Sequence, residues 1–257
     1  MRVLPLRYYE IAERDIRILN PFSLEKLMRV GYAAQLRRGM RILDLACGKG
    51  EMLCQWAKNF GIIGVGVDHS DVFLTAARSR SAELKVEDKV QFAKGDAGKY
   101  VIQPASYDVI CCIGATWIRE NFDGTVQFTR PGLREGGLLI VGEPFWRQLP
   151  LPEDYARSLS EEDLRLGFRD LVGTLKRIED NGMQLTSMIL ANEDDWDNYE
   201  TTHWRNMEQW VRENPEDTDA REFQETMRKD RETYLRWGRR YLGWGVFIIR
   251  EPKPVVG

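Results

Sequence analysis

Residues 41–53 read RILDLACGKGEML, and this stretch decides the fold class of the chain. The apolar run at 41–45 predicts a buried strand, and a helical pattern begins at Met52. Gly48 and Gly50 lie between them, in a turn where a ligand can approach the backbone and the helix N-terminus closely. The stretch therefore predicts a strand, a ligand-binding turn and a helix in succession.

The turn differs from a dinucleotide-binding turn at its third glycine position. Such turns read G-x-G-x-x-G, because the third glycine lets the helix and the strand pack closely around a pyrophosphate. In this chain that position is Leu53. Asp44, near the end of the strand, would repel a phosphate and suits a cationic group. The turn therefore favours a ligand other than a dinucleotide.

The rest of the chain alternates short strands with longer helical stretches, which is typical of a parallel α/β sheet. Several strands are continuous apolar runs, as expected when helices cover both faces of the sheet. We predict strands at 41–45, 62–67, 90–93, 107–113, 138–143, 184–190 and 244–250. We predict helices at 7–19, 23–37, 52–59, 70–85, 116–129 and 160–181, with two further helical pieces separated at Pro215.

The chain is predicted to form a single domain over residues 1–257. Its four parts are an N-terminal helical lid, a cofactor-binding core, a helical insertion, and a last strand with its tail, at 1–39, 40–191, 192–240 and 241–257. The insertion is rich in Trp and Tyr, and insertions of this length are often functional lids or binding elements. A helical pair that only packs its aromatic side chains on the domain is an open alternative.

Acidic residues follow the second and third predicted strands. Asp68 lies 18 positions after Gly50 and can accept hydrogen bonds from both hydroxyls of a ribose. Asp96 closes the third strand, where its carboxylate can bind an adenine amino group. The fourth strand leads into small residues, Gly114 and Ala115. These elements, in this order, predict a site for an adenosine-containing ligand.

With these motifs the chain resembles the class I S-adenosylmethionine-dependent methyltransferases, especially the UbiE-like small-molecule group, from about Arg41 to Glu143. Residues 113–118, 143–150 and 243–247 are also similar to a narrower bacterial group, the YjhP-like proteins. The resemblance implies a Rossmann-like α/β fold with helices on both faces of a seven-stranded, mostly parallel sheet. The implied strand order is 3-2-1-4-5-7-6, with only the seventh strand antiparallel.

The resemblance also implies the cofactor, S-adenosyl-L-methionine, and the product S-adenosyl-L-homocysteine. The methionine half would be lined by Asp44, Ala46, Gly48 and Gly50. Asp68 would hold the ribose beside His69, Asp96 and Ala97 would hold the adenine, and Cys112 would face the cofactor. The family usually has Gly where this chain has Ala46.

Methyl transfer from a sulfonium requires that the acceptor and the methyl group are held in line, and a base is needed only if the acceptor must lose a proton. Candidates lie at the carboxyl ends of strands four and five, and in the lid and the insertion. We predict Glu143 and His203 as catalytic residues. We predict that the acceptor is bound by Trp117, Arg119, Trp146, Arg147 and Tyr199. Each also has a structural alternative, such as a surface ion pair or core packing.

Composition limits the class of protein. The chain has 37 Lys plus Arg and 40 Asp plus Glu, a net charge of −3, so it lacks the basic balance of a nucleic-acid-binding protein. No apolar run approaches the roughly 20 residues that span a bilayer. The four cysteines lack the spacing of a zinc site, so no metal is expected. We expect a cytoplasmic enzyme with a small-molecule acceptor and no membrane partner. A nucleic-acid or protein methyltransferase and a non-catalytic adenosine-binding protein are the alternatives.

Overall fold

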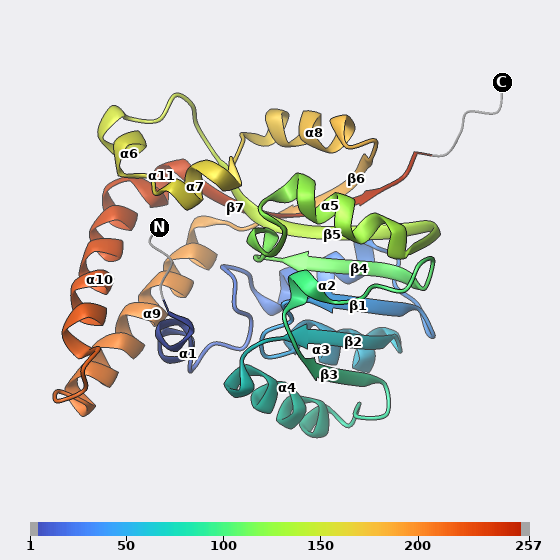
Figure 1. The fold of residues 1–257 in the computed structure, drawn as a ribbon, viewed down its shortest axis with the longest axis horizontal. Helices are drawn as coiled ribbons and strands as arrows, with labels where there is room; N and C mark the ends of the chain where they lie inside the picture. Colours follow the sequence, from blue (N-terminus) through green and yellow to red (C-terminus); the bar gives the residue numbers. More distant parts are fainter. Residues whose placement is uncertain (1–4, 253–257) are drawn as a thin grey trace.

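The computed structural model describes residues 5–252, and these residues build one seven-stranded sheet (Figure 1). The strand order is β3-β2-β1-β4-β5-β7-β6, and β7 runs antiparallel to both of its neighbours. The predicted order and the antiparallel seventh strand are therefore confirmed. The strands are β1 (Arg41–Leu45), β2 (Ile63–Asp68), β3 (Val90–Lys94), β4 (Tyr107–Ile113), β5 (Leu133–Trp146), β6 (Gln184–Leu190) and β7 (Leu242–Arg250).

Helices lie on both faces of the sheet and beyond the carboxyl ends of its parallel strands (Figure 1). The α-helices are α1 (Leu6–Ala12), α2 (Leu24–Ala33), α3 (Glu51–Phe60), α4 (Asp71–Leu84), α5 (Phe122–Thr129), α6 (Glu153–Ser158), α7 (Glu161–Leu166), α8 (Leu171–Asp180), α9 (Glu193–Glu213), α10 (Ala220–Thr233) and α11 (Arg239–Tyr241). Short 3-10 turns are η1 (Ala97–Lys99), η2 (Thr116–Arg119) and η3 (Arg130–Gly132), and η4 (Tyr234–Gly238) is a π-turn. Within residues 5–252, no helix has both the length and the apolar character to cross a membrane.

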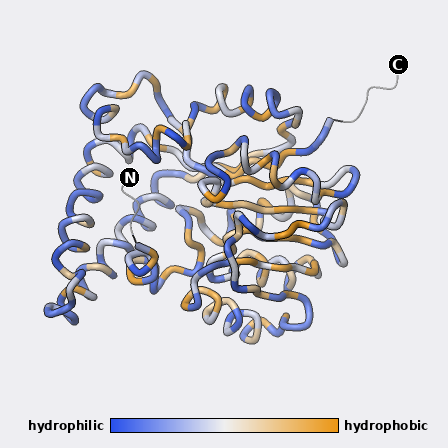
Figure 2. Tube along the Cα trace, in the orientation of Figure 1, coloured by the Kyte–Doolittle hydropathy of each residue, from blue (hydrophilic) through white to orange (hydrophobic). Residues whose placement is uncertain are grey.

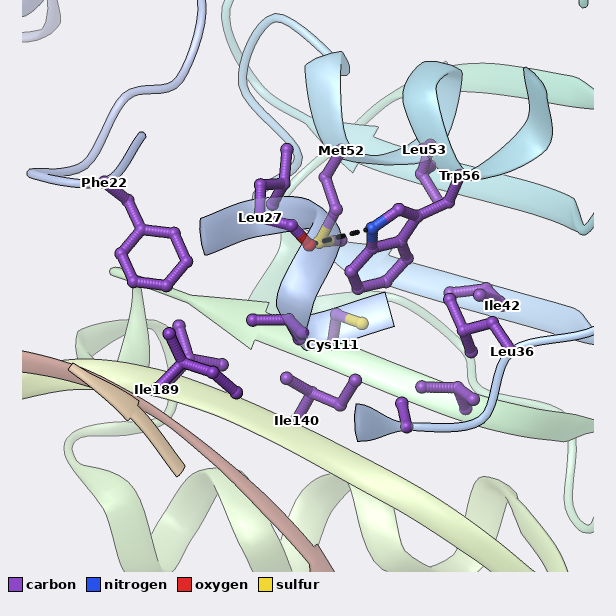
Figure 3. Packing of buried hydrophobic residues seen from close by; sticks show 14 of the residues in the cluster. Phe22, Leu27, Leu36, Ile42, Met52, Leu53, Trp56, Cys111, Ile140 and Ile189 are labelled. Carbon is purple, nitrogen blue, oxygen red and sulfur yellow. Dashed lines mark hydrogen bonds between the residues drawn. The ribbon is translucent and has the colours of Figure 1, made fainter. Parts of the chain in front are cut away.

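The apolar core has one layer on each face of the sheet. Successive residues of a strand point to opposite faces, so Cys111 joins the layer under α2 and α3 while Cys112 joins the layer under α5 and α8. Figure 3 shows the first layer, in which the fully buried Trp56 donates its Nε1–H to the carbonyl of Leu27 at 3.2 Å. Hydrophobic colouring follows the strands, whereas α9 and α10 are largely hydrophilic (Figure 2). The sheet is therefore the rigid base of the molecule.

A third, smaller apolar cluster joins the N-terminal helix to the insertion. It contains Tyr8 and Ala12 of α1, Met207 of α9, and Phe223 and Met227 of α10. The break between α9 and α10 contains Pro215, as the sequence predicts. Because α1 and α9 stand beyond the carboxyl ends of β1 and β4, this cluster holds two helices over the ligand edge of the sheet (Figure 1).

Three predicted helices are wrong in their extent. The helix predicted at 7–19 ends at Ala12, because the next residues turn to face the glycine turn. The helix predicted at 160–181 is divided at Gly167, whose φ of +63° ends α7. The helix predicted at 116–129 is a 3-10 turn followed by α5, since Asn121 caps α5 by accepting the N–H of Gly124.

Candidate functional site

In the turn between β1 and α3 the backbone lies so close to neighbouring side chains that an added Cβ would collide with them. Ala46, Gly48 and Gly50 all have positive φ, at +57°, +52° and +66°. A Cβ on Gly50 would lie 2.5 Å from the ring of Phe92, and one on Gly48 would lie 2.6 Å from Cδ1 of Leu19. Glycine is required at both positions, whereas Ala46 adopts its left-handed conformation with a methyl group in place.

Two buried carboxylates lie beside this turn. Asp68 accepts the N–H of Gly48 through Oδ2 at 2.8 Å and the N–H of Ser70 through Oδ1 at 2.9 Å. Asp44 is 4% exposed, and burial, with the nearby charge of Asp68, raises its pKa well above the ordinary value. A ligand cation would stabilise the ionised form of Asp44. The chemistry of Asp44 therefore matches the cationic methionine end of the predicted cofactor.

A pocket of about 260 Å³ opens at the carboxyl ends of β1, β2 and β3. Its lining brings together Ala46, His69, Asp96, Ala97, Trp117 and Ile118. Asp96 also accepts the N–H of Gly98 at 2.9 Å, and its hydrogen bond with Lys99 lowers its pKa. The first four lining residues belong to the predicted cofactor set. Trp117, predicted to bind the acceptor, lines the same pocket.

Cys112 and Glu143 lie deeper than this pocket. Cys112 has no exposed surface and belongs to the apolar layer under α5 and α8. Glu143 is 2% exposed, accepts the hydroxyl of Thr116 at 3.3 Å and lies 3.9 Å from the guanidinium of Arg177. Burial raises the pKa of Glu143 to about 7. Glu143 is thus a buried acid held between η2 and α8.

The other predicted acceptor residues each have partners in the chain. Arg119 donates to the carbonyl of Gly98 at 3.1 Å and stacks over Phe128. Trp146 is 8% exposed and packs edge-on against Tyr155. Arg147 donates to the carbonyl of Leu242 at 3.1 Å. These contacts hold the three side chains in place on the α5 and α6 sides of the site.

The lid and the insertion meet at a polar cluster, which we call the Glu13 cluster: Glu13, Tyr199 and His203. Tyr199 donates its hydroxyl to Oε1 of Glu13 at 2.8 Å, and Nε2 of His203 lies 3.7 Å from the same oxygen. The rings of Tyr199 and His203 are 4.2 Å apart. The two predicted catalytic residues therefore lie in different places, since Glu143 contacts Thr116 and Arg177 and His203 contacts the lid.

Burial sets the protonation of the Glu13 cluster. It raises the pKa of Glu13 to about 8, with the bond from Tyr199 and the charge of Lys49 acting in the opposite direction. It lowers the pKa of His203 to about 4, so the imidazole is neutral at pH 7. At pH 7 the neutral imidazole of His203 can accept a proton, whereas the carboxyl of Glu13 is largely protonated and becomes an acceptor only once it is ionised.

Lys49 connects the lid to the glycine turn. Its Nζ donates to the carbonyls of Glu13, Arg14 and Ile16 at 2.7, 2.9 and 2.8 Å. Our sequence analysis missed both Lys49 and Glu13. Lys49 lies between the two glycines of the motif that decides the fold, and this position could have identified it as a candidate residue of the site. Glu13 offered none, because a glutamate in an amphipathic helical pattern indicates a solvated face.

Comparisons with known proteins identify the family of the chain. The family model described as a methyltransferase domain matches residues 42–137. YjhP of Escherichia coli, described as uncharacterized, is 38% identical over 243 residues, which are 95% of this chain and 97% of YjhP. A SAM-dependent methyltransferase from Thiobacillus denitrificans, crystallised with S-adenosyl-L-homocysteine, has a TM-score of 0.90 at 40% identity, covering 97% of this chain and 99% of its own. The corresponding complex from Geobacter sulfurreducens has a TM-score of 0.89 at 41% identity, covering 98% and 100%.

Proposed function

This chain belongs to the S-adenosylmethionine-dependent methyltransferases, in the group that includes YjhP, and we propose that it methylates a small-molecule acceptor by in-line displacement. The observation that carries the proposal is the closure of the ligand edge of the sheet. Lys49 holds residues 13–16 over the glycine turn, and Tyr199 of the insertion is bonded to the same segment. An enclosed site of this kind suits a small molecule better than a folded macromolecule.

The residues around the glycine turn fit the cofactor in charge and in space. Asp44 and the turn backbone would hold the methionine end, and Asp68 would accept the ribose hydroxyls. Asp96, Ala97, His69 and Trp117 would enclose the adenine. When bound, S-adenosylmethionine supplies a methyl group already activated on a sulfonium, so the chain has to position the acceptor and exclude water.

The acceptor side of the proposal lies between α1 and α9. His203 and Tyr199 line it from the insertion, and His203, neutral at pH 7, is proposed to accept a proton or a hydrogen bond from the acceptor. We also propose Glu143 as an acid–base residue. It would act from the cofactor side of the site, through the hydroxyl of Thr116, which is hydrogen-bonded to it. We propose that the rim of the acceptor site is lined by Arg119, Trp146 and Arg147. The contacts that each of them makes within the chain would hold its side chain in place there.

The proposal includes one domain over residues 1–257 and a cytoplasmic location. The net charge of −3 supports a small-molecule acceptor, because an enzyme acting on nucleic acid is expected to carry excess basic charge. A macromolecular acceptor is the competing outcome of the experiment below.

The experiment uses S-adenosylmethionine with an isotopically labelled methyl group. The protein is incubated separately with the small-molecule fraction and the macromolecular fraction of a bacterial lysate, and mass spectrometry locates the label. We expect labelled products in the small-molecule fraction. They should be lost in Asp68→Ala and retained in Asp71→Ala, a matched control whose exposed carboxylate pairs with Lys94 at the surface. Label found only in the macromolecular fraction, or in neither fraction, would refute the proposal.

A further inference from the structure

We propose that the acceptor is a protonated primary or secondary amine, bound with its ammonium group against Glu13. The proposal rests on the proposed function, because it names the substrate class of the same site. It starts from the fact that Glu13, with a side chain only 6% exposed, has no cationic partner of ordinary ion-pair geometry. Within residues 5–252, no Lys or Arg side chain forms an ion pair with it.

The nearest ammonium group of the chain is engaged elsewhere. Lys49 gives its three N–H groups to the carbonyls of Glu13, Arg14 and Ile16, so it has no donor left for the Glu13 carboxylate. The remaining neighbours of that carboxylate are the phenol of Tyr199 and the imidazole of His203. With only these two neighbours, the carboxylate oxygens of Glu13 can accept hydrogen bonds from further donors.

Unpartnered polar atoms also lie on α9. In the described part of the chain, buried side-chain atoms of this helix without a hydrogen-bond partner include Trp196 Nε1, His203 Nε2 and Asn206 Oδ1. Buried polar atoms in native proteins are nearly always satisfied, so such a group on one helix indicates a missing partner.

Asn206 locates that missing partner next to Glu13. It has no exposed surface, and it donates its Nδ2–H to the carbonyl of Ala12 at 2.9 Å, directly before Glu13 in the chain. Its Oδ1 is an acceptor without a donor. A neutral imidazole and a carboxylate add further acceptors. A ligand that brings several N–H donors matches this set, whereas a carboxylate or a phosphate would add acceptors to it.

Charge favours the same ligand class. Burial, together with the charge of Asp68, raises the pKa of Glu13 despite the hydrogen bond from Tyr199 and the charge of Lys49, so a ligand cation would stabilise the ionised carboxylate further. Lys49 is the one nearby cation whose charge acts in the stabilising direction. His203 adds no positive charge at pH 7, since burial lowers its pKa to about 4.

The reaction is balanced for an amine. Because Glu13 is largely protonated at pH 7, it releases its proton to solvent as the ammonium binds. The resulting carboxylate then takes one proton from the bound ammonium, which frees a lone pair on nitrogen. That lone pair forms the new N–CH₃ bond, and the electron pair of the old S–CH₃ bond stays on sulfur. A second N–H proton leaves the methylated nitrogen after transfer, through solvent when the product departs. A carboxyl that titrates near pH 8 is well matched to an amine at neutral pH.

The test measures binding to protein saturated with S-adenosyl-L-homocysteine, so that the cofactor's own ammonium is already in place. The probes are three matched molecules: 2-phenylethylamine, 2-phenylethanol and 3-phenylpropionate. By calorimetry we expect the amine to bind at least about tenfold more tightly than the alcohol, and the carboxylate to bind most weakly. The preference should vanish in Glu13→Gln and persist in Glu25→Gln, a control at an exposed glutamate of α2.

A second variant protects the test against loss of folding. Tyr199→Phe keeps the ring and the carboxylate but removes the hydroxyl that bonds Glu13, so the amine preference should be retained or increased. Binding of the alcohol or the carboxylate as tightly as the amine would overturn the inference. Absence of binding of all three probes up to about 10 mM would also overturn it. Small-molecule methylation in the labelling experiment would still stand in either case, so the two proposals fail separately.

Discussion

Replacing Lys49 with methionine should release the lid from the cofactor turn. The substitution keeps the length of the side chain and removes an ammonium that makes three hydrogen bonds, at 2.7, 2.9 and 2.8 Å. A hydrogen bond to a charged group is worth about 1.5–3 kcal/mol net. The three bonds share one half-buried ammonium, whose burial lowers the pKa of Lys49 and opposes the gain. We therefore expect a loss of about 3 kcal/mol, the value of one strong bond and part of a second.

Hydrogen exchange measured by mass spectrometry tests this value. A loss of about 3 kcal/mol corresponds to roughly a hundredfold rise in the open population of the lid. Exchange of the amides in residues 13–20 should rise by that factor in Lys49→Met, while the strands of the sheet keep their protection. Lys58→Met is the matched control, because Lys58 is exposed at the end of α3. Exchange in residues 13–20 within twofold of the parent protein would refute the role given to Lys49.

Three further predictions follow from single contacts. Gly114→Ala should destabilise the protein by about 3 kcal/mol in thermal unfolding, because its φ is +78° and a Cβ would lie 2.1 Å from Oδ1 of Asn20. Gly39 has a φ of +83° and open space around its Cβ position, so Gly39→Ala should lower the free energy of unfolding by only about 1 kcal/mol. Equal losses of stability in the two variants would contradict the steric clash proposed at Gly114. Trp117→Ala should weaken S-adenosyl-L-homocysteine binding about tenfold in calorimetry without lowering the melting temperature; unchanged affinity would remove Trp117 from the cofactor site. Glu13 has a pKa of about 8 in the folded protein and an ordinary value of 4.5, so between these pH values the folded state binds more protons than the unfolded state. The free energy of unfolding should therefore fall as the pH rises from 4.5 to 8, by at most about 5 kcal/mol. Glu13→Gln should flatten this fall in denaturant titrations, and an unchanged slope would show that Glu13 is not responsible.

The sheet could be predicted from sequence because each strand carries its own signal. β1, β4 and β6 have the predicted bounds, since a continuous apolar run and a following turn mark them locally. The residues that line the pocket could be predicted for the same reason. Ala46 and His69 directly follow β1 and β2, and Asp96 lies two residues after β3, so the carboxyl ends of these strands bring them to one edge.

The Glu13 cluster could not be predicted in the same way, because its contacts join distant segments. Tyr199 and Glu13 are 186 positions apart, and no local pattern links them. The prediction of a helix over 7–19 is wrong for the same reason. The apolar spacing of this segment favours a helix, but Lys49 donates to the carbonyls of Glu13, Arg14 and Ile16 and so holds these residues in a turn against the glycine turn.

The small apolar cluster between the N-terminal helix and the insertion has a consequence for how the chain folds. Asn206 and Ala12, bonded at its edge, are 194 positions apart, so closing this contact has a large entropic cost unless the sheet between them has already formed. We expect the cofactor edge to be complete before α1 docks on α9. Refolding followed by pulsed hydrogen exchange should therefore protect β1 and β4 in an earlier kinetic phase than α9, and ligand recognition should mature in two steps.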